Sequence, residues 1–172
     1  LGYAERGGGA CGEHSHGISI WQHFAHCLDA GRVVEVIATM DMVEQDGATY
    51  DRIAQLNLKT ESGLTGYVVQ DVVTEPPVKT VRIQGDRGAV EWYANYQSGH
   101  DGVVTHGDSG LTEQLFAKSR PDDFKGEIDH VGMILEGTVP QVDSPMKLQR
   151  GLDTMLVILA AHESNRLGRA VR

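Results

Sequence analysis

Five segments between residues 33 and 97 have the β-branched content or the two-residue alternation of strands, and no helical pattern separates them. The five segments are Val33–Val43, Asp51–Thr60, Leu64–Glu75, Lys79–Gly85 and Ala89–Gln97. Short turn sequences connect them, and such connections join antiparallel neighbours, because parallel strands need a crossover of about a dozen residues or more. The order predicts a mostly antiparallel sheet and argues against βαβ units.

A helix is predicted before the strands. Apolar residues recur at helical spacing over Glu13–Leu28, and the carboxylate of Glu13 suits a first helical turn. Gly31 follows as a stop signal. After the strands, the glycine-rich segment Gly99–Gly110 is predicted to be a polar loop.

Two further helices are predicted near the end of the chain. The first begins at Pro121, with acidic residues in its first turn. The second has Ser144 as its N-cap and Pro145 in its first position, and it runs to about Arg166. Its predicted core-facing stripe comprises Leu148, Leu152, Met155, Leu156, Leu159 and Ala160.

This order of elements predicts an α+β fold, in which helices cover one face of an open, mostly antiparallel sheet. We expect residues 1–172 to form a single domain. Strands such as Val33–Val43 have aliphatic residues on both faces. The uncovered face is therefore expected to be buried against another domain or subunit.

Charge and composition exclude several classes of protein. The chain has 15 Lys and Arg residues and 24 Asp and Glu residues, which gives a net charge of -9. Without a basic stripe, a nucleic-acid partner is not expected. No apolar run is long enough for a membrane span, and no secretory signal is present. The two cysteines have no disulfide or zinc spacing, which predicts a cytoplasmic protein. Because the first residue is Leu1 and not Met, we expect a segment upstream of it.

The opening stretch RGGGACGEHSHG contains a G-x-G-x-x-G match at Gly7, Gly9 and Gly12. A dinucleotide-binding loop of this kind follows a buried strand and receives the pyrophosphate at a helix N-terminus. Here no buried strand precedes the glycines, and Glu13 would place a carboxylate where the phosphate should lie. The stretch is therefore interpreted as a glycine-rich loop that leads into a helix.

Several histidines follow this loop and admit three interpretations. A metal site would use His14, His16 and His23, but on a helix His16 and His23 are about 10 Å apart along the axis. We therefore expect no metal and favour structural histidines over ligands. The third interpretation is proton transfer, because Glu13 and His16 are three residues apart and a carboxylate beside an imidazole suits general acid–base work.

Four segments together resemble the C-terminal domain of the Gfo/Idh/MocA oxidoreductases, which include glucose–fructose oxidoreductase and inositol 2-dehydrogenase. These segments are Gly7–His26, Val33–Met42, Thr80–Trp92 and Ser144–Val171, and the resemblance runs over nearly the whole chain. It implies that an N-terminal Rossmann domain, outside this chain, holds NAD or NADP. It also implies that this domain supplies the substrate wall and, through its open sheet, the interface of a homo-oligomer. The fragment alone is then expected to be inactive.

The resemblance also implies site residues. The family's motif after the glycines is an acid, three residues and then a histidine that exchanges the substrate hydroxyl proton. Glu13 occupies the acid position, whereas Gly17 occupies the histidine position and His16 precedes it by one residue. We therefore assign the proton to His16, oriented by Glu13, with His14 or His23 as the alternatives. Residues expected to contact a sugar, inositol or related polyol are His14, Gln22, His23 and His106. The resemblance also implies a catalytic lysine in an E-K-P motif, which lies in the family's Rossmann domain and has no counterpart in this chain.

A competing hypothesis belongs to another class of protein. In it the chain is a non-enzymatic binding or assembly module that uses its open sheet face, and the histidines are structural. A third hypothesis is a metal-dependent enzyme that uses His14, His16 and His23.

Overall fold

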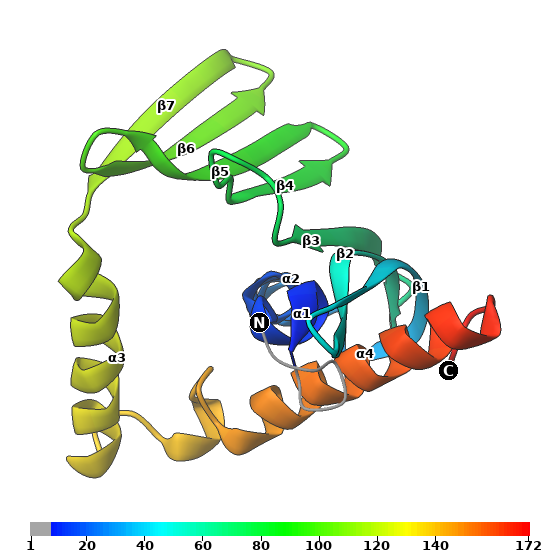
Figure 1. The fold of residues 1–172 in the computed structure, drawn as a ribbon. Coiled ribbons are helices and arrows are strands. Elements are labelled where there is room, and N and C mark those ends of the chain that lie inside the picture. Colours follow the sequence, from blue (N-terminus) through cyan, green and yellow to red (C-terminus); the bar gives the residue numbers. More distant parts are fainter. Residues whose placement is uncertain (1–7) are drawn as a thin grey trace. The chain divides into compact units, whose positions relative to one another are not determined.

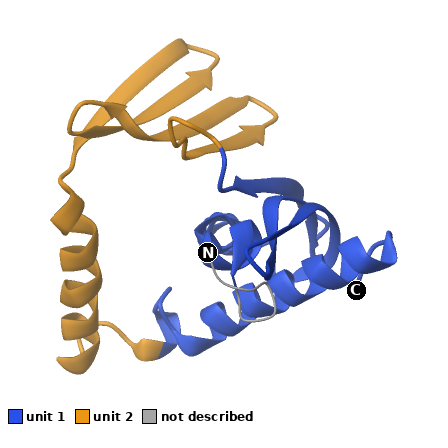
Figure 2. Ribbon diagram, viewed as in Figure 1, with its two compact units in different colours: residues 1–73, 142–172 blue, residues 74–141 orange. Residues whose placement is uncertain are grey.

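A computed structural model describes residues 8–172, and their contacts divide the chain into two compact units (Figures 1 and 2). Unit 1 combines the chain up to residue 73 with residues 142–172, and unit 2 comprises residues 74–141. Each unit is described by itself. Both contain antiparallel strands and helices, which confirms the predicted α+β fold.

The sheet of unit 1 contains β1 (Val33–Gln45), β2 (Ala48–Thr60) and β3 (Thr65–Asp71), in the antiparallel order β1-β2-β3. Its strands alternate between buried and exposed residues, so one face forms the core. The inward residues are Val36, Ala38, Met40, Ala54, Leu56, Leu58 and Val68. On the second strand the inward face is formed by Ala54, Leu56 and Leu58, as its two-residue alternation indicates.

Helices α1 (Gly9–Glu13), α2 (His16–Cys27) and α4 (Leu148–Leu167) cover this inward face (Figure 1). Polar side chains of α4 tie it to β1. Ser164 Oγ accepts the Ala38 N–H at 3.0 Å, and Asn165 Oδ1 accepts the Met40 N–H at 2.9 Å. These bonds fix the helix along the outer strand of the sheet.

Unit 2 contains a second sheet in the order β4-β5-β6-β7. Its strands are β4 (Thr80–Gly85), β5 (Gly88–Gln97), β6 (His100–Gly107) and β7 (Gly110–Ala117). Helix α3 (Arg120–Leu135) follows, and its N-terminus is closed by a capping box in which Ser119 and Asp122 satisfy each other's backbone. A 3₁₀ turn, Gln141–Asp143, leads back to unit 1.

Two predictions about elements are wrong, and a third is wrong only in where its helix begins. The five expected strands exist, but they are divided between two sheets and not joined in one. The expected loop Gly99–Gly110 is mostly strand β6, which pairs with both β5 and β7. The expected helix Glu13–Leu28 is confirmed over most of its length as α2, but α2 begins at His16, and Glu13 instead ends the separate helix α1.

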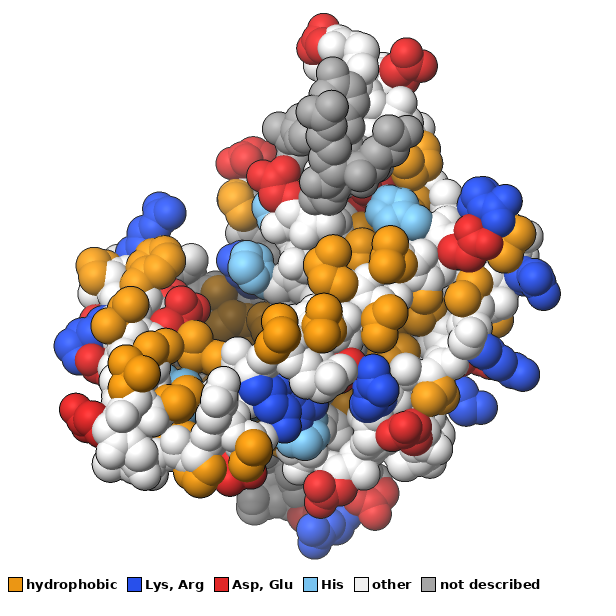
Figure 3. Space-filling view, turned by 90° about the horizontal axis from the view of Figure 1, so that it is seen from below, with side chains coloured by type: hydrophobic (Ala, Val, Ile, Leu, Met, Phe, Trp, Pro, Cys, Tyr) orange, Lys and Arg blue, Asp and Glu red, His pale blue; other side chains and the backbone are white. Residues whose placement is uncertain are grey.

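The last helix also differs from its prediction. It begins at Leu148 and not at Pro145, while Ser144 Oγ accepts the Met146 N–H in the preceding turn. Its C-terminus is as expected, because Gly168 adopts the left-handed conformation just beyond Leu167. Most of the predicted core-facing stripe is exposed, and hydrophobic side chains accordingly line the surface seen from below (Figure 3). The exposed residues are Leu148, Leu152, Met155, Leu156 and Leu159.

Candidate functional site

The candidate site of unit 1 is the turn between α1 and α2. His14 follows the last residue of α1, Ser15 precedes α2, and His16 is its first residue. The Ser15 N–H bonds to Gly12 O and the Gly17 N–H bonds to His14 O, so two three-residue steps interrupt the α-helical ladder. Glu13, His14 and His16 are exposed on this turn.

Both helices begin without a capping side chain of their own. Helix starts leave N–H groups without intrahelical partners. Asp51 of β2 supplies one partner, because its Oδ2 accepts the Cys11 N–H at 2.6 Å. Gln70 of β3 supplies another, because its Oε1 accepts the Ile18 N–H at 3.3 Å. Side chains of the sheet therefore cap the N-termini of both helices.

Two glycines make room for these caps. A Cβ on Gly17 would lie 2.6 Å from Gln70 Oε1, and one on Gly9 would lie closer still to Asp51 Oδ1. Gly9 also has a φ of +88°, which side-chain-bearing residues rarely adopt. The glycines are therefore required by packing against the sheet.

This arrangement bears on the G-x-G-x-x-G match. The first turn of the helix that Gly9 opens already contacts the buried carboxylate of Asp51, and a phosphate placed there would meet a like charge. The described residues of the motif therefore do not fit a pyrophosphate. Gly7, the first residue of the match, lies outside the described residues.

The proposed acid–base pair does not form a direct contact. Glu13 and His16 lie on different helices, and between these two described residues there is no hydrogen bond or ion pair. The expectation that they share one helical face is wrong, because the turn at residues 14–15 interrupts the helix.

The other predicted residues of α2 lie on two faces. His16 and His23 are seven residues apart and therefore share one face, about 10 Å apart along the axis. Gln22 is turned toward α4, where its Oε1 accepts the Thr154 hydroxyl at 2.8 Å. It also lines a shallow hollow of about 220 Å³ with Arg32 and Asp153.

Cysteine chemistry at the turn is limited. Burial, with a smaller contribution from the charge of Asp51, raises the pKa of the Cys11 thiol to about 12, so it stays protonated at neutral pH. Cys27 is exposed, and its Sγ lies 3.7 Å from His23 Nε2. Among residues 8–172, no group of three or more His, Cys, Asp or Glu side chains is arranged to hold a metal ion.

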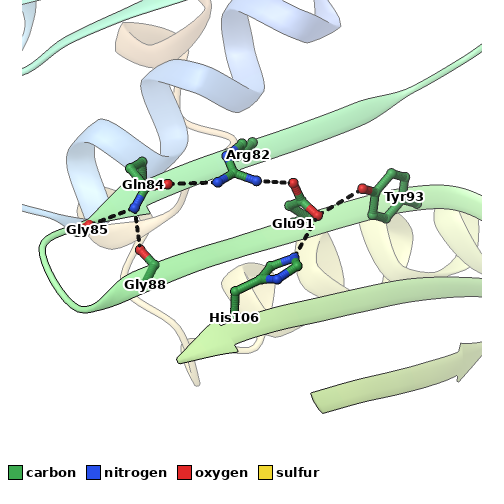
Figure 4. A network of polar contacts seen from close by, with 7 residues as sticks. All are labelled: Arg82, Gln84, Gly85, Gly88, Glu91, Tyr93 and His106. Atoms are coloured by element: carbon green, nitrogen blue, oxygen red, sulfur yellow. Dashed lines mark hydrogen bonds and ion pairs between the residues drawn. The ribbon is translucent and has the colours of Figure 1, made fainter. Parts of the chain in front are cut away.

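His106 lies in unit 2, on β6, and belongs to a polar network on one face of that sheet (Figure 4). The carboxylate of Glu91 is its centre. Glu91 accepts hydrogen bonds from the Tyr93 hydroxyl at 2.9 Å and from Arg82, and its Oε2 lies 3.1 Å from His106 Nε2. Gln84 extends the network, since its Oε1 accepts from Arg82 Nη2 at 2.8 Å.

This network shifts two pKa values. The hydrogen bonds from His106, Tyr93 and Arg82 hold the pKa of Glu91 below its ordinary value. The hydrogen bond to Glu91 raises the pKa of Tyr93, because the phenol proton is held by a negative acceptor. Near pH 7 Glu91 is therefore a carboxylate held in place by three donors.

Asp51 and Gln70 are the site residues that the sequence analysis missed. A signal existed for Gln70, since it follows inward-facing Val68 by two residues and so places a polar group on the core face of a strand. Asp51 was harder to find, because a register shift between Asp41 and Met42 on β1 alters the alternation beside it.

No helix within residues 8–172 has both the length and the hydropathy that crossing a bilayer requires.

No protein-family model and no curated protein sequence matches the chain. Solved structures do match its fold. An aldose-aldose oxidoreductase from Caulobacter crescentus, complexed with glycerol, is 21% identical with a TM-score of 0.70 over 92% of this chain and 45% of its own. An oxidoreductase from Agrobacterium radiobacter, in complex with NAD+, L-tartaric acid and magnesium, is 21% identical with a TM-score of 0.66 over 87% and 46%. An NAD binding oxidoreductase from Klebsiella pneumoniae is 17% identical with a TM-score of 0.73 over 96% and 50%.

The chain thus spans about half the length of the solved structures that it matches. At this level of identity the likeness is one of fold. The fold of this chain is the fold of one half of these oxidoreductases.

Proposed function

We propose that this chain is the substrate-binding and oligomerisation domain of an oxidoreductase that transfers a hydride between NAD or NADP and a sugar, inositol or related polyol. The observation that carries the proposal is the fold match, which takes in nearly all of this chain but about half of each oxidoreductase. The remaining half is then expected to be a Rossmann domain that holds the cofactor.

The contacts of the described residues support a domain that binds the substrate next to the cofactor and does not itself hold the cofactor. The helix that follows the glycines has its first turn capped by the Asp51 carboxylate, so a pyrophosphate does not fit there. We therefore assign cofactor binding to the proposed Rossmann domain and give this chain the tasks of binding substrate and moving its hydroxyl proton.

The exposed turn between α1 and α2 is the surface proposed for these tasks. We assign the proton to His16, whose imidazole is accessible to a ligand, with Glu13 contributing negative charge from the end of α1. His14 and His23 are proposed to contact substrate hydroxyl groups. His23 shares the helical face of His16, which fits a polyol lying along α2.

Two further residues are proposed substrate contacts with narrower roles. Gln22 already uses its Oε1 to accept from Thr154, so its amide nitrogen is the end proposed to donate to a substrate oxygen. His106 has one ring nitrogen beside Glu91, which leaves Nδ1 as the atom proposed to face a hydroxyl group.

The proposal is tested by NMR titration of the chain with D-glucose and myo-inositol. We expect saturable shifts that include the backbone and imidazole signals of His14, His16 and His23. In the matched pair of variants, His16→Ala should weaken the response, whereas His26→Ala, an exposed histidine on the same helix, should leave it intact.

The same preparation should be inactive with NAD or NADP and either polyol. Polyol-dependent reduction of the cofactor by the isolated chain would contradict the proposal that a separate Rossmann domain binds the cofactor. Absence of any saturable response to sugars, polyols and hydroxy acids would favour the assembly-module hypothesis instead.

A further inference from the structure

We propose that Asp51 and Gln70 are positioning residues, which fix the backbone on both sides of the α1–α2 turn and thereby set the place from which the His14 and His16 side chains project. The link to catalysis rests on the proposed function. The link to the geometry of the turn rests on the contacts alone.

Both residues occupy the place of a missing N-cap. A capping side chain ordinarily accepts the N–H of the second or third helical residue. Cys11 is the third residue of α1 and Ile18 is the third residue of α2, and these are the N–H groups that Asp51 and Gln70 accept. Gly8 and Ser15, which precede the two helices, make no side-chain cap.

Gln70 joins the two helices to each other. Its Oε1 accepts from Ile18 at the start of α2, while its Nε2 donates to Ala10 O at 3.1 Å and to Cys11 O at 3.4 Å in α1. A carboxylate cannot make the donor half of this bridge, and an apolar side chain can make neither half. The amide of Gln70 is therefore matched to both helices at once.

Burial makes these bonds persistent. Asp51 is fully buried and Gln70 is 7% exposed, so water competes poorly for the hydrogen bonds they form. The strands that carry them, β2 and β3, form part of the core sheet. The two anchor points at Cys11 and Ile18 are thus tied to the core sheet of unit 1.

The histidines lie between these anchors. His14 and His16 are exposed, and among the described residues neither imidazole has a hydrogen bond or ion pair that would orient it. The backbone of the turn therefore fixes where the two side chains begin and the direction of their Cα–Cβ bonds. Loosening an anchor should disturb the imidazoles while the sheet stays folded.

The test is amide hydrogen exchange and imidazole NMR on the whole 172-residue chain, with Gln70→Met, Gln70→Glu and the control Gln55→Met. Methionine has a similar length but no polar group. Gln55 is an exposed glutamine on the other face of the same sheet. In Gln70→Met we expect exchange at Ile18 to rise about tenfold or more, and the His14 and His16 imidazole signals to shift, while Leu56 stays protected.

Gln70→Glu separates the two halves of the bridge. Its carboxylate can still accept the Ile18 N–H, so protection at Ile18 should return, while the imidazole signals should stay shifted because the bonds to Ala10 and Cys11 are lost. Gln55→Met should match the unchanged chain. Should Gln70→Met fail to fold, these expectations for Gln70→Glu decide the matter.

Unchanged protection at Ile18 with unchanged imidazole signals in Gln70→Met would overturn the proposal. So would equal loss of protection at Ile18 and Leu56, which would mean that Gln70 only supports global stability. The measurement needs neither substrate nor cofactor. A chain that binds no polyol but shows the expected pattern would refute the proposed function and leave the positioning role standing.

Discussion

His16 is the residue on which the proposed chemistry depends most. Its imidazole is exposed at the first position of α2, and its proposed task is to exchange the substrate hydroxyl proton. In the proposed full-length enzyme, His16→Ala should lower kcat by roughly 10²–10⁴-fold, the range for a lost acid–base group. His26→Ala is the matched control and should leave kcat unchanged. Steady-state kinetics that show no effect of His16→Ala would transfer the role to His14 or His23.

Glu91 gives unit 2 a defined response to acid. Its pKa is held below the ordinary 4.5 by donors that include His106 and Tyr93, so the stabilisation it provides is present above that value and lost as the pH falls through the lower, folded-state value. Glu91→Gln should therefore flatten the acid limb of the stability profile below about pH 4.5. Urea unfolding followed at Trp92 over this range is the measurement. Glu113→Gln, an exposed carboxyl on β7, is the control, and an equal flattening in both variants would contradict the account.

At the scale of elements, helix α4 shows why an apolar stripe is insufficient to orient a helix. Apolar residues lie on two sides of α4: Val157 and Ile158 are buried, whereas Leu159 is exposed. The inward face contains the polar residues Asp153, Thr154 and Ser164, which bond to Arg32, Gln22 and the backbone of β1. The sequence analysis identified only the apolar stripe, because the partners of these polar residues lie on other elements.

The orientation of α4 predicts unequal effects for two neighbouring residues. Ile158 is 6% exposed and Leu159 is 62% exposed. Ile158→Ala should lower the free energy of unfolding by about 2–4 kcal/mol, whereas Leu159→Ala should change it by less than about 1 kcal/mol. Chemical denaturation of the chain distinguishes them. The reverse order would mean that α4 packs through its predicted stripe.

Most elements of the fold were predictable because their signals are local. The alternation of Asp51–Thr60 identified β2, and Pro121 with the acidic residues after it marked the start of α3. Strand β6 was missed because only its centre, Val103–Thr105, has the residue types of a strand. The glycines in and beside it indicate a loop, and these are Gly99, Gly102, Gly107 and Gly110. Gly102 has a tertiary reason, since a Cβ there would lie 2.6 Å from the ring of Tyr96. The caps that Asp51 and Gln70 provide to α1 and α2 were also missed. Each joins residues 40 or more positions apart in the sequence, so no local pattern predicts it.

At the scale of the whole molecule, the uncovered face of the β1-β2-β3 sheet is the proposed oligomer interface. Ile37, Asn57 and Tyr67 form one cross-strand row on this face, and Tyr67 is 72% exposed. Self-association would bury such apolar side chains. Light scattering after size exclusion should show an oligomer.

Tyr67→Lys should shift that oligomer toward monomer, because a charge on this face opposes burial. Ser109→Lys, which adds the same charge at the exposed β6–β7 turn, should not. A strict monomer at high concentration, or equal dissociation in both variants, would contradict this interface.

The central claim is that this chain forms one half of a nicotinamide-dependent oxidoreductase, and the coding sequence upstream of Leu1 tests it most directly. Reading about 100–200 codons covers one domain. The account predicts a buried strand followed by G-x-G-x-x-G, with an E-K-P motif further along. A start codon immediately before Leu1 would contradict the claim and leave a domain that acts by binding alone.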